Sequence, residues 1–228
     1  MPYTKKIVCL ANSWRHPSGI CIAGKEVLDQ GFGPWVRPVS ERSSRELSKG
    51  ECSYSNGQAP GLLDIVEINL ERQIPEGHQK ENHLHNDDYY WGKKGVCDWN
   101  KLQSAIDEPD GPLWYNNSAS NNGINDRVPR SYTRHLESSL YLIKPEGVIL
   151  KIQNETTAYG YSRLRVRAYF EYKGEEYLLA VTDPQINNRY CYARYDDISL
   201  SNVLVCISLG EVFYGYAYKL VAGIIEKS

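Results

Sequence analysis

In one segment of the second half of the chain, tyrosine or arginine alternates with apolar residues at every second position. Its odd positions hold Tyr161, Arg163, Arg165, Arg167 and Tyr169, and from position 164 to 170 its even positions hold Leu, Val, Ala and Phe. Successive side chains of a β-strand point to opposite faces. The segment is therefore predicted to be a strand with one apolar face and one face of tyrosine and arginine.

The rest of the chain also favours β structure. It has 18 tyrosines against 3 phenylalanines, and 11 of those tyrosines lie between residues 159 and 218. Tyrosine is common in strands and on wet aromatic surfaces. Short apolar or alternating runs predict strands at residues 6–11, 33–39, 62–70, 140–143, 147–152, 163–172, 176–182, 203–209 and 214–225, with hairpin turns at Lys173–Gly174 and Gly210–Glu211.

Two segments are predicted to be helical. Residues 40–49 have the pattern of a short polar helix that ends before Gly50. Residues 98–106 begin with Asp98 as an N-cap and place Trp99, Leu102 and Ile106 on one face. The predicted fold class is therefore mainly β, with small closed or half-closed antiparallel barrels and a few short helices.

A long irregular connection divides the chain. Residues 107–135 are rich in Pro, Gly and Asn, which is typical of a junction between domains. A chain of 228 residues is long enough for two small domains. The predicted organisation is an N-terminal barrel at 1–110 with a helix near 98–107, an irregular junction at 111–135 and a C-terminal barrel at 136–228.

Composition excludes several classes of protein. The 26 basic and 28 acidic residues exclude a chain that is basic overall, although they leave room for a local basic face. No apolar run is long enough to predict a transmembrane helix, and the N-terminal apolar run ends at Ala11, too early for a signal peptide. Six cysteines without a CxxC pair favour buried free thiols. We therefore predict a cytoplasmic protein without a membrane partner.

The predicted arginine face suggests a ligand. Three arginines on one strand face repel one another, and a ligand with negative charge or a π surface would relieve that repulsion. Aromatic and guanidinium groups on a sheet are typical of surfaces that bind single-stranded nucleic acid. Two other interpretations stay open: a protein-binding face, and a solvated face on which Glu171, Glu175, Glu176 or Asp183 pairs with the arginines. The candidate nucleic-acid-binding residues are Tyr161, Arg163, Arg165, Arg167 and Tyr169.

A second group of polar residues lies at predicted strand ends and in the junction, where binding residues often gather. Arg127, near Arg130 and Arg134, would grip phosphate in a loop between the domains, unless this is a solvated basic turn. Lone arginines at strand ends also serve as salt-bridge partners. The candidate cleft or phosphate-binding residues are Asn12, Arg15, Lys25, Arg37 and Arg127.

The sequence shows no recognisable catalytic or cofactor motif. His83 and His85, followed by Asp87 and Asp88, have the chemistry of metal ligands, but no second cluster completes a site. Glycine-rich phosphate loops and nucleophile motifs are also absent from the sequence. No metal, no cofactor and no catalytic residue is therefore predicted.

A series of short motifs resembles a known family. The chain carries KKIVCLANS at 5–13, CIAGK at 21–25, WVRPVS at 35–40, YYW at 89–91, PLW at 112–114, NGINDR at 122–127, VTDP at 181–184 and SLGE at 208–211. In this order the motifs resemble the bacterial dual-OB-domain proteins, over essentially the whole chain. The resemblance implies two OB-like antiparallel barrels, which bind ligands on a strand face flanked by loops, and a prokaryotic defence context. It implies no reaction.

The predicted function is a nucleic-acid or nucleotide binding module that uses the tyrosine and arginine face, as a sensor or accessory subunit rather than an enzyme. Single-stranded nucleic acid or a nucleotide is the predicted partner. Two alternatives stay open. One is an enzyme that acts on a nucleotide or modified base in a cleft between the barrels, which an enclosed pocket with a convergent acid or base would favour. The other is a protein-interaction scaffold.

Overall fold

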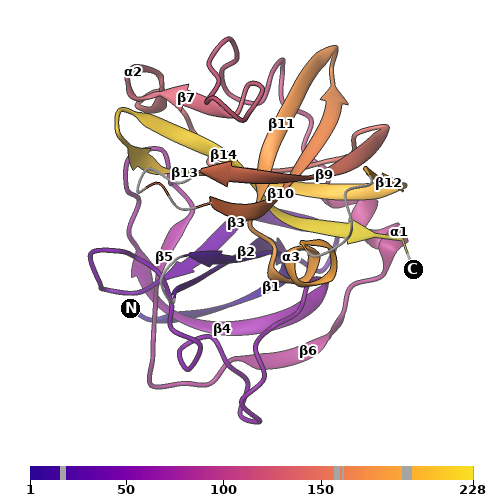
Figure 1. The fold of residues 1–228 in the computed structure, drawn as a ribbon. Coiled ribbons are helices and arrows are strands. Elements are labelled where there is room, and N and C mark those ends of the chain that lie inside the picture. Colours follow the sequence, from indigo (N-terminus) through magenta and orange to yellow (C-terminus); the bar gives the residue numbers. More distant parts are fainter. Residues whose placement is uncertain (16–18, 157–159, 161, 192–196, 228) are drawn as a thin grey trace. The chain divides into compact units, whose positions relative to one another are not determined.

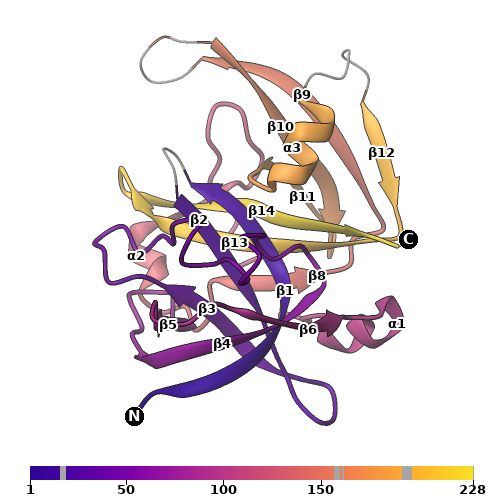
Figure 2. The ribbon, with the colours of Figure 1, turned by 90° about the horizontal axis from the view of Figure 1, so that it is seen from below.

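The structure is a computed structural model that describes residues 1–15, 19–156, 160, 162–191 and 197–227. The chain forms two compact units (Figures 1 and 2). The first consists of Met1–Ile106 and Glu137–Ser139, and the second of Asp107–Leu136 and Leu140–Ser228. None of the helices in the described part of the chain has the length and apolar character needed to span a lipid bilayer.

The first unit is a closed barrel. Its sheet has the strand order β1-β2-β3-β5-β4-β6, and β1 also pairs with β4, which closes the sheet on itself. The pairing of β3 with β5 is parallel and the other pairings are antiparallel. The strands are β1 (Tyr3–Arg15), β2 (Gly19–Val27), β3 (Phe32–Val39), β4 (Asp64–Gln73), β5 (Asn82–His85) and β6 (Gly92–Val96).

The second unit repeats this order. Its sheet runs β12-β9-β10-β11-β14-β13-β8, so β9, β10, β11, β14 and β13 follow one another as β1, β2, β3, β5 and β4 do. The third and fourth strands of this series, β11 and β14, pair in parallel, as β3 and β5 do in the first unit. The described residues contain no pairing between β9 and β13, so this barrel is half-closed. The strands are β7 (Arg127–Pro129), β8 (Leu140–Ile143), β9 (Gly147–Thr156), β10 (Ser162–Tyr172), β11 (Glu175–Val181), β12 (Ile198–Ser201), β13 (Val203–Phe213) and β14 (Tyr216–Glu226).

The few helices are short, as predicted for a mainly β fold. They are α1 (Trp99–Leu102), the 3₁₀ helix η1 (Gln103–Ala105), α2 (Arg130–Thr133) and α3 (Pro184–Tyr190). The Asp98 side chain caps α1 by accepting a hydrogen bond from the amide of Asn100 at 2.8 Å. The predicted helix at 98–106 is therefore confirmed, as a helical turn followed by η1.

The helix predicted at residues 40–49 is wrong, because this segment forms turns instead. Arg45 has a positive φ of 57°, which a helix does not allow. Leu47 forms a bridge with Ile20 and is fully buried. A polar segment with one apolar residue gains more from burying that residue in the barrel than from forming a helix without an apolar face.

One predicted hairpin turn is correct and the other is displaced. Lys173 and Gly174 both have positive φ between β10 and β11, as a two-residue hairpin turn requires. Gly210 and Glu211, in contrast, lie inside β13, where the register with β14 shifts between Leu209 and Val212. Glycine is common at such bulges as well as at turns, and the sequence did not separate the two.

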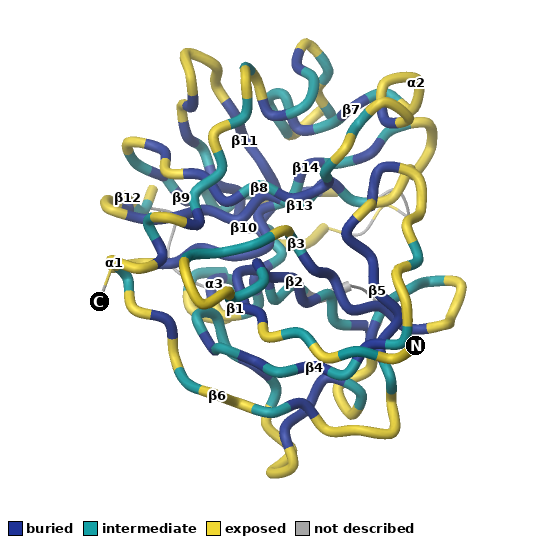
Figure 3. Tube along the Cα trace, turned by 180° about the vertical axis from the view of Figure 1, so that it is seen from behind, coloured by how far each residue is buried: buried dark blue, intermediate teal, exposed yellow. Residues whose placement is uncertain are grey.

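Each unit has its own apolar core, and in Figure 3 buried stretches alternate with exposed loops. The first core includes Ile7, Val66 and Ile68, which are fully buried. The second includes Val166 and Phe170 of β10. All six cysteines are free, as predicted, but the predicted burial holds for four of them, since Cys21 and Cys191 are half-buried.

Gly24 marks the tightest point of the first barrel. A Cβ atom at this position would lie 1.9 Å from the carbonyl oxygen of Val8, a backbone atom that cannot move without disturbing β1. We expect Gly24→Ala to lower the free energy of unfolding of the first unit by about 1–3 kcal/mol, as overpacking does elsewhere. Gly50→Ala is the matched control, since a Cβ there meets nothing within 4 Å. Equal melting temperatures for the two variants would contradict the close approach.

Candidate functional site

Strand β10 separates its side chains as the period of two predicts. Val166, Ala168 and Phe170 are at most 1 % exposed and belong to the second core. Leu164 departs from the pattern, because it is 40 % exposed. The core face of β10 therefore begins at Val166, and the strand before it is exposed to solvent on both faces. Tyr161 lies outside the described residues.

Arg167 is at the centre of a buried ion-pair network. Its Nε lies 2.5 Å from Oε1 of Glu155 on β9, and its Nη1 lies 3.6 Å from Oδ2 of Asp126. All three residues are at most 7 % exposed. Asp126 is held in turn by Ser120, whose amide donates to Oδ1 at 2.7 Å. Arg167 is thus compensated inside the unit and is not part of the accessible face.

Arg163 and Arg165 form the accessible part of the predicted arginine face. Among the described residues, Arg165 forms an ion pair with Glu155 alone, at 3.6 Å, and shares that carboxylate with Arg167. Burial, together with the guanidinium groups of Arg163 and Arg167, lowers the pKa of Arg165 below its ordinary value. Arg163 is exposed, and no carboxylate in the described part of the chain forms an ion pair with it. Positive charge on this face therefore exceeds its local compensation.

The acidic partners differ from those expected. The sequence offers Glu171, Glu175, Glu176 and Asp183 as partners, but Arg165 and Arg167 pair with Glu155 and Asp126. Glu176 instead accepts a hydrogen bond from the hydroxyl of Tyr169. The Asp183 side chain caps α3.

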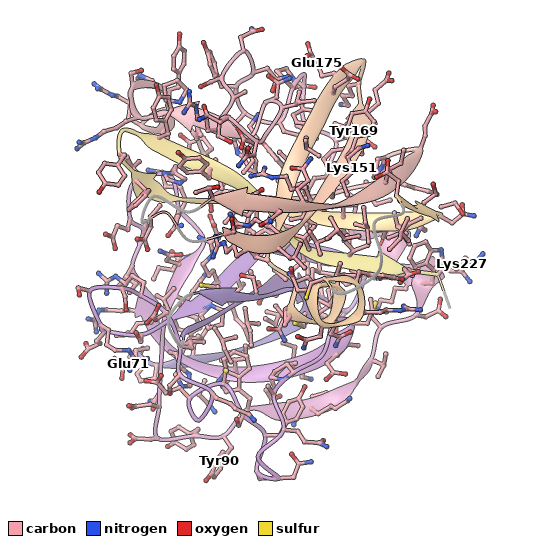
Figure 4. The ribbon with its side chains drawn as sticks, in the orientation of Figure 1. Glu71, Tyr90, Lys151, Tyr169, Glu175 and Lys227 are labelled. Atoms are coloured by element: carbon pink, nitrogen blue, oxygen red, sulfur yellow. The ribbon has the colours of Figure 1, made fainter. Side chains whose placement is uncertain are left out.

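An open groove continues the face at its other end. Tyr169 pairs with Ile149 of β9, which pairs with Ser199 of β12. These three residues line a groove of about 400 Å³ whose lining also includes Glu171. The ammonium of Lys151 lies 5.8 Å from the centre of the Tyr169 ring, and Figure 4 shows the two side chains as neighbours. An aromatic ring, an aliphatic side chain and a cation therefore lie side by side on β9 and β10.

The candidate residues in the first unit have separate partners. The Asn12 side chain donates a hydrogen bond to the carbonyl oxygen of Pro60 at 2.8 Å. Lys25 is buried, with its ammonium 5.6 Å from the centre of the Trp35 ring. The side chain of Arg15 lies outside the described residues.

Arg37 takes part in a second buried ion pair. Its Nη2 lies 3.1 Å from Oε1 of Glu81 and donates a hydrogen bond to the hydroxyl of Ser139 at 3.0 Å. Ser139 also donates to Glu81, so each of the three side chains contacts the other two, which ties segment 137–139 to the first barrel.

Arg127 lies in the second unit, on β7. Its guanidinium lies 4.0 Å from the centre of the Tyr216 ring, and its Nε donates a hydrogen bond to the hydroxyl of Ser118 at 3.1 Å. Arg127 pairs with Tyr218 across β7 and β14. The guanidinium is therefore fixed against an aromatic ring, without an ion pair among the described side chains.

Comparison with known proteins agrees with the repeated strand order. A family model described as the dual OB-containing domain matches residues 5–224. The chain belongs to this family. No curated protein and no solved structure matches the chain. The predicted family and the mainly β fold are thus confirmed, and a bacterial origin stays a prediction. Membership in the dual OB-containing domain family favours a binding module, because OB barrels bind oligonucleotides and oligosaccharides on a strand face.

The two histidines of β5 form hydrogen bonds with aromatic side chains of the first unit. The hydroxyl of Tyr3 and Nδ1 of His83 form a hydrogen bond of 2.5 Å, and burial lowers the pKa of His83 to about 4. The Nε1–H group of Trp91 donates to Nδ1 of His85 at 3.4 Å. Within the described residues, no group of three or more His, Cys, Asp or Glu could hold a metal ion.

Lys219 is a residue that the sequence reasoning missed. It is 1 % exposed, and its Nζ donates hydrogen bonds to the carbonyl oxygen of Tyr115 at 2.6 Å and to Oδ1 of Asn116 at 3.0 Å. Burial lowers the pKa of Lys219 to about 7. The sequence did contain a signal of its burial, because Lys219 lies between Ala217 and Val221 at the alternate positions of a strand that are otherwise apolar.

Proposed function

We propose that this protein is a single-stranded nucleic-acid-binding module that acts as a sensor or accessory subunit, with the outer face of β9 and β10 as a binding surface. The observation that carries the proposal is the charge on this face. Arg165 and Arg167 pair with the carboxylates of Glu155 and Asp126, whereas Arg163 on the same strand face has no ion pair among the described residues.

A phosphate group would relieve this imbalance. The two accessible guanidinium groups lie one strand repeat apart, on the same side of β10. Guanidinium binds phosphate through two parallel hydrogen bonds and stacks on bases, so it suits a flexible single strand.

The groove at Tyr169 offers a place for a base. Ile149 and the Tyr169 ring give it apolar walls, and the hydroxyl of Ser199 offers a hydrogen bond. The groove is open to solvent, which suits a polymer that passes along the surface more than a small substrate enclosed for catalysis.

The test is the affinity of a labelled oligo-dT and a labelled oligo-rU of about 20 nucleotides, long enough to cover one OB fold. Binding to the wild type is expected to weaken steeply as salt rises from about 50 to 200 mM. The variant Arg163→Ala/Arg165→Ala should bind about tenfold more weakly, and the slope of log K against log salt should fall by about 1.4, which is 0.7 for each lost phosphate contact.

One control variant and one single-site variant accompany this test. Arg72→Ala/Arg189→Ala removes the same charge from exposed arginines that already pair with carboxylates, and it should leave the affinity unchanged. Arg163→Ala alone alters only an exposed side chain, so it keeps the test valid if the double variant is unstable. The proposal fails if no oligonucleotide binds at low salt. It also fails if the β10 variants bind as tightly as the wild type.

A further inference from the structure

The hairpin between β13 and β14 places aromatic residues at its tip. Phe213 pairs with Tyr216, and Tyr214 and Gly215 form a two-residue turn. Both turn residues have positive φ, 47° at Tyr214 and 85° at Gly215. A turn of this kind favours Asn or Asp followed by Gly, and a bulky residue in the left-handed region is strained. Tyrosine therefore occupies a position where a smaller residue would be more stable.

The strained residue is also the most exposed large aromatic side chain on the described surface. Tyr214 is 85 % exposed and Phe213 is 63 % exposed. Their ring centres lie 4.4 Å apart in an edge-to-face arrangement. Strain and exposure at one residue both oppose stability, so their combination indicates a role outside the fold.

The backbone of the tip contacts the neighbouring segment. The amide of Arg130 donates a hydrogen bond to the carbonyl oxygen of Gly215 at 2.9 Å. Strand β7 pairs with β14 from Tyr216 to Tyr218, and the guanidinium of Arg127 lies over the Tyr216 ring. Figure 1 shows β7 and α2 beside this end of the hairpin. A loop whose backbone is already held in place loses less entropy when it binds.

Three arginines lie on or beside the segment that contacts the turn, since the Arg130 amide bonds to Gly215, Arg127 contacts the Tyr216 ring, and Arg134 follows α2. Arg130 and Arg134 are exposed, and neither forms an ion pair with a carboxylate in the part of the chain that the structure describes. Arg127 is bound to a ring and a hydroxyl instead of to an acid. Exposed rings with uncompensated guanidinium groups beside them match the stacking and phosphate contacts that a single nucleic-acid strand offers.

We propose that this aromatic tip (Phe213 and Tyr214, with Arg127, Arg130 and Arg134) is a second contact surface for the same single-stranded nucleic acid. The rings stack on bases, and the arginines hold the adjoining phosphates. The inference rests on the proposed function, but it concerns residues of another hairpin and has its own test.

The variant Tyr214→Asn separates binding from folding. Asparagine tolerates the left-handed conformation, so the melting temperature should rise by about 2–4 °C. The affinity for oligo-dT should nevertheless fall by about tenfold, because one stacking contact is lost. Tyr90→Asn is the matched control, since Tyr90 is a 69 % exposed tyrosine of the first unit, visible in Figure 4, and it should not change the affinity.

The charged part of the tip is tested with Arg130→Ala/Arg134→Ala. The slope of log K against log salt should fall by about 1.4, as it should for the β10 double variant. The inference is overturned if Tyr214→Asn and the arginine variant both bind oligo-dT like the wild type. In that case the β10 variants decide whether the proposed function stands. A wild type that binds no oligonucleotide at low salt overturns both.

Discussion

Replacing Arg167 by alanine is expected to lower the free energy of unfolding of the second unit by about 3–5 kcal/mol. The reason is that the two carboxylates that pair with Arg167 would remain buried without it. Glu155 and Asp126 are both buried, and without this guanidinium their charges would be only partly compensated, by Arg165 and by the Ser120 amide. Urea unfolding of the full chain, followed by tyrosine and tryptophan fluorescence, measures the loss.

The controls for Arg167→Ala lie on the same strand and in the same network. Arg163→Ala removes an exposed guanidinium and should change stability by no more than about 0.5 kcal/mol. Adding Glu155→Gln and Asp126→Asn to the Arg167 variant removes the stranded charges and should recover much of the loss. If Arg167→Ala unfolds like Arg163→Ala, the ion pairs do not stabilise the unit.

Lys219 should make stability depend on pH above neutrality. Its pKa is about 7 in the folded chain against about 10.4 in an unfolded one. Below pH 7 both states carry the ammonium, and the folded state bears its full burial penalty. Between these two values the folded state has lost the proton while the unfolded state keeps it, so the unfolded state binds more protons and stability rises with pH.

The size of this effect follows from one proton. The slope is at most about 1.4 kcal/mol per pH unit, which gives a gain of about 2 kcal/mol between pH 7 and pH 9. Lys219→Met should lack it, so the difference in unfolding free energy between wild type and variant should change by that amount. Cys52, whose pKa burial raises to about 11, acts in the opposite direction, but it is present in both proteins and cancels. If the unfolding free energies of the wild type and Lys219→Met change in parallel with pH, the pKa of Lys219 is not lowered by burial.

Features decided by neighbours in sequence were predictable. The alternation of Arg165, Val166, Arg167 and Ala168 is enough to place β10 and its apolar face, because a strand has a fixed period. The Asp98 cap and the Lys173–Gly174 turn are also local, since each depends on one or two residues and their backbone angles. The strand runs in both halves, with the motif resemblance, were sufficient to predict a dual-barrel fold.

The accessibility of the candidate site was not predictable in the same way. Arg163 and Arg167 have the same pattern of neighbours in the sequence, yet Arg163 is exposed and Arg167 is buried, with 4 % of its surface accessible. Strand register places Glu155 of β9 opposite Arg163, yet its carboxylate pairs with Arg165 and Arg167. Asp126, which also pairs with Arg167, approaches from the segment before β7, so its position depends on the path of a long connection. The aromatic tip was missed for a similar reason, because Gly210 accommodates a bulge and the turn falls at Tyr214 instead.

The sequence by itself therefore determined the strands with a clear apolar or alternating pattern and the apolar face of β10, because these depend on a period of two and on residue type. It did not predict β6, β7 or β12. Only the tertiary structure decided which arginines are neutralised, where the last hairpin turns and that Lys219 is buried. The physical reason is that charge compensation and burial are set by groups that meet in space through strand pairing, and a single sequence does not specify the register of distant strands.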